Sequence, residues 1–191
     1  MSISITLHRS GTSRTEQVDT TTTGLDLFGS ERDVVAMRVD GILVDLQREL
    51  HDGAEVEPVE ATSEDGLNVI RHSCTHVMAQ AVQQLYPEVN LGIGPFITDG
   101  FYYDFGNIEP VTPEVLTELE KRMKRIVKEN QRFVRRVTSE ESAREELADQ
   151  PYKLELIGTK GKGADGASVE VGGAELTIYD NVRRNGEVAW K

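Results

Sequence analysis

The sequence predicts an α+β protein of two domains, and three features support this fold class. The first sixty or so residues alternate short apolar runs with turn signals, which is typical of a small sheet. From Leu67 the apolar spacing changes to the period of a helix, and the later segments mix helices with short strands. With 191 residues, 38% of them hydrophobic, the chain can build a core for each domain.

Residues 1–62 are predicted to form the first domain, a small mixed sheet with a helix packed on one face. SISITL and RTEQV flank a turn signal and predict a hairpin with its apolar residues on one side. GLDLFGSE can form one or two helical turns. Asp40-Gly41 separates VVAMRV from ILVDL, and Asp-Gly between two apolar runs is a strong hairpin signal. AEVEPVE adds a strand, and EATSEDG is the expected domain boundary.

Residues 63–191 are predicted to form the second domain, a mixed α+β unit whose central helix packs on antiparallel strands. The helix has an apolar stripe of Leu67, Ile70, Cys74, Val77, Met78, Ala81 and Leu85. His72 and His76 point away from this stripe, among uncharged residues where a solvated helix face would carry Lys and Glu. We therefore expect the histidine face to be covered by other elements or to line a cleft.

The rest of the second domain is predicted to alternate strands and helices. LGIGPFITDGFYYDF holds two short strands. A long helix begins with Thr112 as N-cap and Pro113 at its first position. Its expected apolar stripe is Leu116, Leu119, Met123, Ile126 and Phe133. SEESAREELA predicts a short helix stopped by Pro151, YKLELI predicts a strand, and the glycine-rich tail predicts hairpins that look cut at Trp190-Lys191.

Composition narrows the compartment and the partners. Cys74 is the only cysteine, and the sequence shows neither a signal peptide nor an apolar run long enough for a bilayer, so we expect a cytoplasmic protein without membrane contact. The net charge of −12 argues against a general nucleic-acid binder, because Lys and Arg supply most non-specific affinity for phosphate. Residues 111–137 differ, with eight basic and four acidic side chains, and their helix either faces solvent or binds RNA.

Two histidines four residues apart project to one side of a helix, which can present them to a metal ion or to a water molecule. The glutamate of a metalloprotease motif is absent between them, and Cys74 points into the apolar stripe. His8 and His51 belong to the first domain, so no metal site is predicted. The alternative interpretation is a pair of hydrogen-bonded histidines in a covered polar face.

Further candidates for chemistry lie later in the chain. In GFYYDF, one of Tyr102 and Tyr103 is expected in the core while the other could offer its hydroxyl to a cleft. Lys153 either faces water or turns toward a cleft, where it could contact an anion or a water molecule. GTKGKGADG lacks the spacing of a P-loop and is interpreted as a hairpin loop.

Taken in order, several segments resemble the N-terminal half of bacterial threonyl-tRNA synthetases. They are IRHSCTHVMAQAVQQLYP, LGIGPFITDGFYYDF, LEKRMKRIVKEN and YKLELI. The resemblance implies that residues 1–62, with VDGILVDLQREL, form the small β-grasp module named TGS. It implies that residues 63–191 form an editing domain of the type shared with alanyl-tRNA synthetases, truncated at its C-terminal end. No cofactor is implied for this part; ATP, magnesium, zinc and a homodimer interface are implied only for the missing synthetase core.

In this family the editing site hydrolyses serine wrongly attached to the threonine tRNA. Serine lacks one methyl group of threonine, and a missing methylene gives only about 1–3 kcal/mol of discrimination, so a second, hydrolytic site is needed. The resemblance implies tRNA as the partner and His72, His76, Lys153 and Tyr103 as catalytic residues. An imidazole with a pKa of about 6.5 is suited to orient and deprotonate a water molecule.

The remaining site residues are also expectations from the resemblance. Asp104, Gln80 and Gln83 are predicted to bind substrate. The predicted RNA-binding residues are Lys121, Arg122, Lys124, Arg125 and Lys128. The family pairs His-x-x-x-His with a later Cys-x-x-x-His, which this sequence lacks. Alternative functions are a non-catalytic RNA-binding or interaction module with structural histidines, an editing protein acting in trans, and a metal-binding protein.

Overall fold

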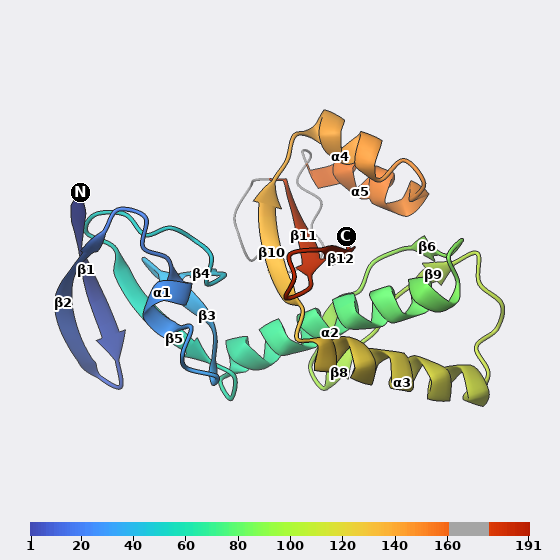
Figure 1. The fold of residues 1–191 in the computed structure, drawn as a ribbon, viewed down its shortest axis with the longest axis horizontal. Helices are drawn as coiled ribbons and strands as arrows, with labels where there is room; N and C mark the ends of the chain where they lie inside the picture. The colour runs from blue at the N-terminus through green and yellow to red at the C-terminus, as the bar shows by residue number, and fades with distance from the viewer. Residues whose placement is uncertain (161–175) are drawn as a thin grey trace. The chain divides into compact units, whose positions relative to one another are not determined.

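A computed structural model of the chain describes residues 1–160 and 176–191, and its mixed α+β architecture agrees with the predicted fold class at that level (Figure 1). Backbone contacts divide the chain into two compact units. The first holds Met1–Ile70, and the second begins at Arg71. Each unit has its own cluster of buried hydrophobic side chains.

The first unit is built on a five-stranded sheet in the order β2-β1-β5-β3-β4. Its strands are β1 (Ser2–Arg9), β2 (Thr12–Asp19), β3 (Val34–Val39), β4 (Ile42–Val44) and β5 (Glu55–Glu60). β1 and β5 run parallel, and the other neighbours are antiparallel. Both predicted hairpins are confirmed. Their two-residue turns, Ser10-Gly11 and Asp40-Gly41, have positive φ at both positions, as type I′ turns require.

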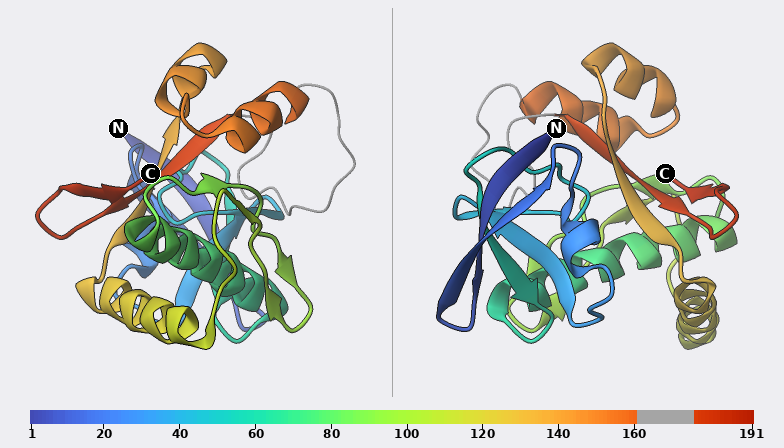
Figure 2. Two further views of the ribbon diagram at one scale, coloured as in Figure 1. Left: turned by 90° about the vertical axis from the view of Figure 1, so that its right-hand side faces the viewer. Right: turned by 60° about the vertical axis from the view of Figure 1, so that its left-hand side comes forward.

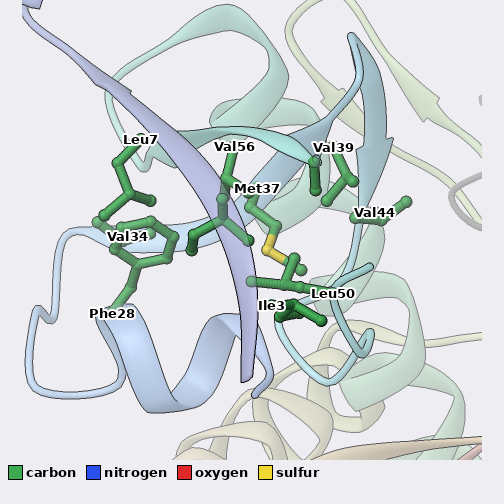
Figure 3. Packing of buried hydrophobic residues seen from close by; sticks show 11 residues of the cluster. Ile3, Leu7, Phe28, Val34, Met37, Val39, Val44, Leu50 and Val56 are labelled. Atoms are coloured by element: carbon green, nitrogen blue, oxygen red, sulfur yellow. The ribbon is translucent and has the colours of Figure 1, made fainter. Parts of the chain in front are cut away.

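One helical turn, α1 (Gly24–Phe28), packs its Phe28 against the sheet, as predicted for GLDLFGSE (Figure 3). β1 alternates buried and partly exposed residues, so that Ile3, Ile5 and Leu7 enter the core. Met37 on the central part of β3 is 0% exposed and lies among these side chains. In β1, the period-2 pattern of the sequence therefore translates directly into one buried face.

In the second unit, two long helices lie side by side (Figures 1 and 2). They are α2 (Glu64–Leu85), whose residues from Arg71 belong to this unit, and α3 (Pro113–Glu129). Between them the chain forms two small antiparallel ladders instead of the two predicted strands. β6 (Asn90–Leu91) pairs with β9 (Phe105–Gly106), and β7 (Phe96–Ile97) pairs with β8 (Gly100–Phe101).

α3 begins as predicted, with Thr112 accepting a hydrogen bond from the N–H of Val115 and Pro113 in the first turn. Its end differs from the prediction. Asn130 adopts a left-handed conformation that caps the helix, so Phe133 lies in β10 (Arg132–Val137) and does not belong to the helical stripe. Leu116, also predicted in the stripe, is exposed, whereas the predicted Leu119 and Ile126 are buried.

β10 forms an antiparallel sheet with β11 (Thr177–Val182) and β12 (Val188–Trp190), in the order β10-β11-β12. The predicted helix in SEESAREELA is confirmed as α4 (Glu140–Glu146), capped by Ser139. The predicted strand YKLELI is wrong, because these residues lie in α5 (Pro151–Lys160). Pro151 begins that helix, a position where its missing N–H costs nothing. An apolar run as short as YKLELI fits both the period of a helix and that of a strand. The predicted loop GTKGKGADG extends beyond the described residues.

The predicted apolar stripe of α2 is correct only in part. Leu67 and Ile70 are 41% and 38% exposed, whereas Thr75 and Gln80, two polar residues, are buried. Ala79, Ala81 and Val82 supply the buried apolar side chains of this helix. The buried surface is thus turned toward the histidine side. Among the described residues, no helix combines the length and the apolar character needed to cross a membrane.

The core of the first unit is expected to be sensitive at Met37. Replacing this fully buried side chain in Met37→Ala leaves a cavity and should lower the free energy of unfolding by about 2–5 kcal/mol. The exposed Ile42 on the neighbouring β4 is a matched control, and Ile42→Ala should change stability by less than about 0.5 kcal/mol. Urea unfolding followed by amide NMR signals of β1, β3 and β5 measures both. Equal effects would contradict the assigned core.

Candidate functional site

The histidine face of α2 is covered at His76, as expected from its lack of charged neighbours. The His76 ring meets the ring edges of Phe133 from β10 and Trp190 from β12, each with a centroid separation of 5.8 Å. His72, one turn earlier, has its ring centroid 5.0 Å from that of His76 and stays exposed to solvent. The two imidazoles are therefore in contact, with His76 covered by aromatic side chains of the sheet and His72 exposed to solvent.

Two further elements bring polar groups to these histidines. The Nζ of Lys153, on α5, donates a hydrogen bond of 3.3 Å to the hydroxyl of Tyr103 and lies 5.7 Å from the centre of that ring. The positive charge of Lys153 also lowers the pKa of both histidines. The four residues predicted as catalytic thus come together from three separate segments. We call His72, His76, Tyr103 and Lys153 the histidine cluster.

Protonation in the cluster is governed mainly by burial. Desolvation, followed by the charges of His72 and Lys153, lowers the pKa of His76 to about 3. Desolvation and Lys153 also lower the pKa of His72, and desolvation raises the pKa of Tyr103 to about 12. At neutral pH both imidazoles are therefore uncharged, and the phenol keeps its proton. Such a site offers neutral proton acceptors beside one cation.

Tyr103 is held by a close approach of the backbone. Its ring stacks on that of Phe105 at 4.7 Å, with 17° between the planes. On its other side is Gly94, where an added Cβ would lie 2.3 Å from the Tyr103 ring and 3.1 Å from the Cβ of Thr75. Thr75 is itself buried and donates a hydrogen bond to the carbonyl oxygen of His72. Only glycine at position 94 leaves room for the tyrosine next to α2.

The residues predicted to bind substrate lie in different environments. Asp104 is exposed, and its backbone N–H donates to the carbonyl oxygen of Ile93 at 2.9 Å. Gln80 is 0% exposed, and its Oε1 accepts a hydrogen bond of 2.8 Å from Asn181. The Oε1 of Gln83 accepts a bond of 2.6 Å from the indole of Trp190. Both glutamine oxygens are thus engaged within the protein.

Sequence reasoning missed Phe133 and Trp190 as neighbours of His76, and Asn181 as the partner of Gln80. They come from three strands that approach α2 only through the tertiary structure. Trp190, the only tryptophan of the chain, is an aromatic residue in a short strand, which by itself predicts core packing as well as a site. No local signal distinguishes the two.

Some basic side chains of α3 form ion pairs within the helix and others do not. Arg122 pairs with Glu118 at 2.9 Å and Lys124 with Glu120 at 2.5 Å, each one helical turn apart. Lys121, Arg125 and Lys128 are exposed and form no ion pair with other residues that the structure describes. The unpaired set is the part of α3 best suited to meet phosphate groups.

Within residues 1–160 and 176–191, no three side chains of His, Cys, Asp or Glu gather closely enough to hold a metal ion. Cys74 is half-buried, and burial raises the pKa of its thiol.

The amino-acid sequence is similar to those of known proteins. No family model matches the chain. Over all of its 191 residues it is 95% identical to a threonine-tRNA ligase of Cutibacterium acnes, of which it covers 28%. It is 62% identical over 182 residues, 93% of the chain, to a threonine-tRNA ligase of Streptomyces avermitilis, covering 28% of that protein. For the Nocardioides sp. ligase the identity is 55% over 182 residues, 91% of the chain and 27% of the relative.

These relatives are all threonine-tRNA ligases by name. Over its full length the chain corresponds to an N-terminal part of threonine-tRNA ligases. The chain spans about 28% of the length of the curated relatives it matches.

The close approach at Gly94 leads to a testable prediction. In Gly94→Ala the new methyl group would collide with the Tyr103 ring, so the ring should move and lose its contact with Lys153. Overpacking of this kind should lower the free energy of unfolding by about 1–3 kcal/mol. Gly100→Ala is the matched control, since a Cβ there meets nothing within 4 Å. Ring NMR signals of Tyr103 and urea unfolding measure both effects, and unchanged Tyr103 signals in Gly94→Ala would refute the assignment.

The lowered pKa of His76 predicts how stability depends on pH. An unfolded chain binds a proton at this histidine below about pH 6.5, whereas the folded chain does so only near 3. The contribution of neutral His76 to the free energy of unfolding is therefore complete above pH 6.5. It declines as the pH falls, by up to about 1.4 kcal/mol per pH unit. His72 acts in the same direction.

Urea unfolding between pH 7 and 5, followed by the fluorescence of Trp190, measures this decline. His76→Phe keeps an aromatic ring without a titrating group and should have a shallower pH dependence than the wild-type chain. Identical slopes for the two proteins would show that His76 is not buried in its neutral form.

Proposed function

We propose that the histidine cluster is an editing site that hydrolyses serine from mischarged threonine tRNA within a threonine-tRNA ligase. The observation that carries this proposal is the convergence of His72, His76, Tyr103 and Lys153 from three separate segments. Two neutral imidazoles beside a cation suit the hydrolysis of an ester at neutral pH. The names of the relatives support tRNA as the partner and the ligase as the whole enzyme.

Each group has a role in this reaction. A water molecule attacks the carbonyl carbon of the seryl ester while His72, the more exposed imidazole, accepts its proton. The ammonium of Lys153 stabilises the negative charge that develops on the carbonyl oxygen, and the protonated Tyr103 donates a hydrogen bond. The bond between carbonyl carbon and ribose oxygen then breaks, and the ribose oxygen takes the proton from His72. His76 remains neutral and orients the neighbouring ring.

The other expectations belong to the same proposal. Residues 1–62 form a TGS module and residues 63–191 the editing domain. The exposed Asp104 contacts the aminoacylated end of the tRNA. The RNA-binding surface comprises Lys121, Arg122, Lys124, Arg125 and Lys128. ATP, magnesium, zinc and the dimer interface belong to the part of the ligase that this chain does not cover, and the enzyme acts in the cytoplasm.

A second candidate function is that of a non-catalytic RNA-binding module. Lys121, Arg125 and Lys128 favour it, because they are exposed and form no ion pair within the described part of the chain, so that they can bind phosphates directly. The net charge of −12 disfavours it as the sole role of an isolated chain. In this case the histidines would be structural.

Hydrolysis of seryl-tRNA for threonine tests the first function. Because the sequence lacks the Cys-x-x-x-His of the family pattern, the assay uses a full-length threonine-tRNA ligase that carries this sequence. His72→Ala should slow hydrolysis by about 10²–10⁴-fold, the usual contribution of a general base. His51→Ala, an exposed histidine of the first unit, should hydrolyse at the wild-type rate.

Binding of the same tRNA separates the two candidates. Under the editing proposal, His72→Ala binds tRNA as tightly as the wild-type protein although it no longer hydrolyses the ester. If His72→Ala retains full hydrolysis, or if the wild-type ligase does not hydrolyse seryl-tRNA, the editing site is not the histidine cluster. Lower affinity after Lys121→Ala would then favour the RNA-binding module.

A further inference from the structure

A buried hydrogen bond joins α2 to β11 beside the histidine cluster. The Nδ2 of Asn181 donates to the Oε1 of Gln80 at 2.8 Å, between residues 101 positions apart in the sequence. Gln80 is 0% exposed and Asn181 is 1% exposed. Gln80 lies one helical turn after His76, on the same face of α2, so this bond and the imidazole share one covered surface.

This amide pair is only half satisfied. The Nε2 of Gln80 and the Oδ1 of Asn181 are buried without a hydrogen-bond partner among the described residues. If the oxygen and nitrogen of both amides were exchanged, the two side chains would still form one hydrogen bond. One donor and one acceptor would again lack a partner among the described residues. Buried polar groups without partners are costly, and apolar side chains of similar size would fill the same space at lower cost. Two amides at this position therefore point to a function other than stability.

A second hydrogen bond continues the contact toward the end of α2. The Nε1 of Trp190, on β12, donates to the Oε1 of Gln83 at 2.6 Å. Asn181 and Trp190 are cross-strand partners, but the next pair is Val182 with Val188, so Ala189 is an extra residue on β12. Such a bulge changes the direction of neighbouring side chains. We call the bonds Gln80–Asn181 and Gln83–Trp190 the polar seam.

Trp190, which belongs to the polar seam, also contacts the ring of His76. Asn181 holds β11, its partner Trp190 holds β12, and the Trp190 ring meets the His76 ring at 89°. Phe133 contacts the same imidazole from β10. The other titratable groups that face His76 are His72, from its own helix, and Lys153, from α5. The Nδ1 of His76 is buried with no hydrogen-bond partner within the described part of the chain, so the surrounding rings orient the imidazole.

We propose that Gln80 and Asn181 are positioning residues: their hydrogen bond fixes β11 and β12 on α2 and thereby sets the orientation of His76 through Trp190. The importance of this orientation for hydrolysis rests on the proposed editing function. The glutamines then act through neighbouring side chains and not by contact with substrate. An apolar contact could hold the sheet on the helix, but it would not define its register, because only directional bonds specify one alignment.

The test replaces both amides at once. Gln80→Met with Asn181→Leu exchanges the pair for apolar side chains of similar size, which removes the bond without leaving an unpaired amide. Gln84→Met, an exposed glutamine of the same helix, is the matched control. Two measurements without substrate report on the seam: contacts between ring protons of His76 and Trp190 by NMR, and the emission wavelength of Trp190, the only tryptophan.

The double variant should lose the His76–Trp190 proton contacts and shift the Trp190 emission to longer wavelength, while its urea midpoint stays at or above that of the wild-type chain. The control should keep the wild-type values. A folded double variant that keeps the ring contacts and the emission would overturn the proposal. In the full-length ligase, the kcat for seryl-tRNA should fall at least tenfold with KM unchanged, as expected for loss of alignment alone.

A measurement on the wild-type chain covers the case in which the double variant does not fold. The side-chain amide protons of Asn181 and the indole proton of Trp190 should exchange with solvent at least tenfold more slowly than those of the exposed Asn185. Equal exchange of the two asparagines would overturn the seam. These signals are independent of hydrolysis, so an inactive wild-type ligase with a protected Asn181 would count against the editing function and not against the positioning role.

Discussion

The second unit depends on one constraint, that a polar face of α2 is covered by a sheet. Covering such a face costs free energy unless its groups find partners. The directional bonds Gln80–Asn181 and Gln83–Trp190 and the ring contacts around His76 offset part of this cost. Because these bonds need particular distances and angles, they define how β10-β11-β12 sits on the helix more narrowly than apolar packing could.

The same covering determines the electrostatics of the candidate site. Burial keeps His76 uncharged far below its ordinary pKa, and Lys153 strengthens this effect while it also bonds to Tyr103. A neutral imidazole pair and a single cation are thus consequences of how the elements pack, and His72 keeps its access to solvent. The arrangement provides a proton acceptor and a positive charge at one place.

Sequence reasoning was most successful where the signal was local. The hairpins followed from Ser10-Gly11 and Asp40-Gly41, because few residues tolerate positive φ, and α3 followed from Thr112 and Pro113 as a start signal. It failed where two periods fit the same residues, as in YKLELI, which forms α5. It also placed Phe133 in a helix because apolar spacing continued across the left-handed cap at Asn130.

By itself, the sequence determined the α+β class, the first-unit hairpins, α2 and α3, and the histidine pair His72 and His76, since side-chain periodicity and motif spacing are properties of neighbouring residues. The choice of Tyr103 and Lys153 over other side chains came from the resemblance to threonyl-tRNA synthetases. The tertiary structure decided which side of α2 is buried, that Asn181 bonds to Gln80, and that Trp190 contacts His76. These outcomes depend on contacts across about a hundred residues of chain, and no local pattern encodes which distant strand will cover a helix.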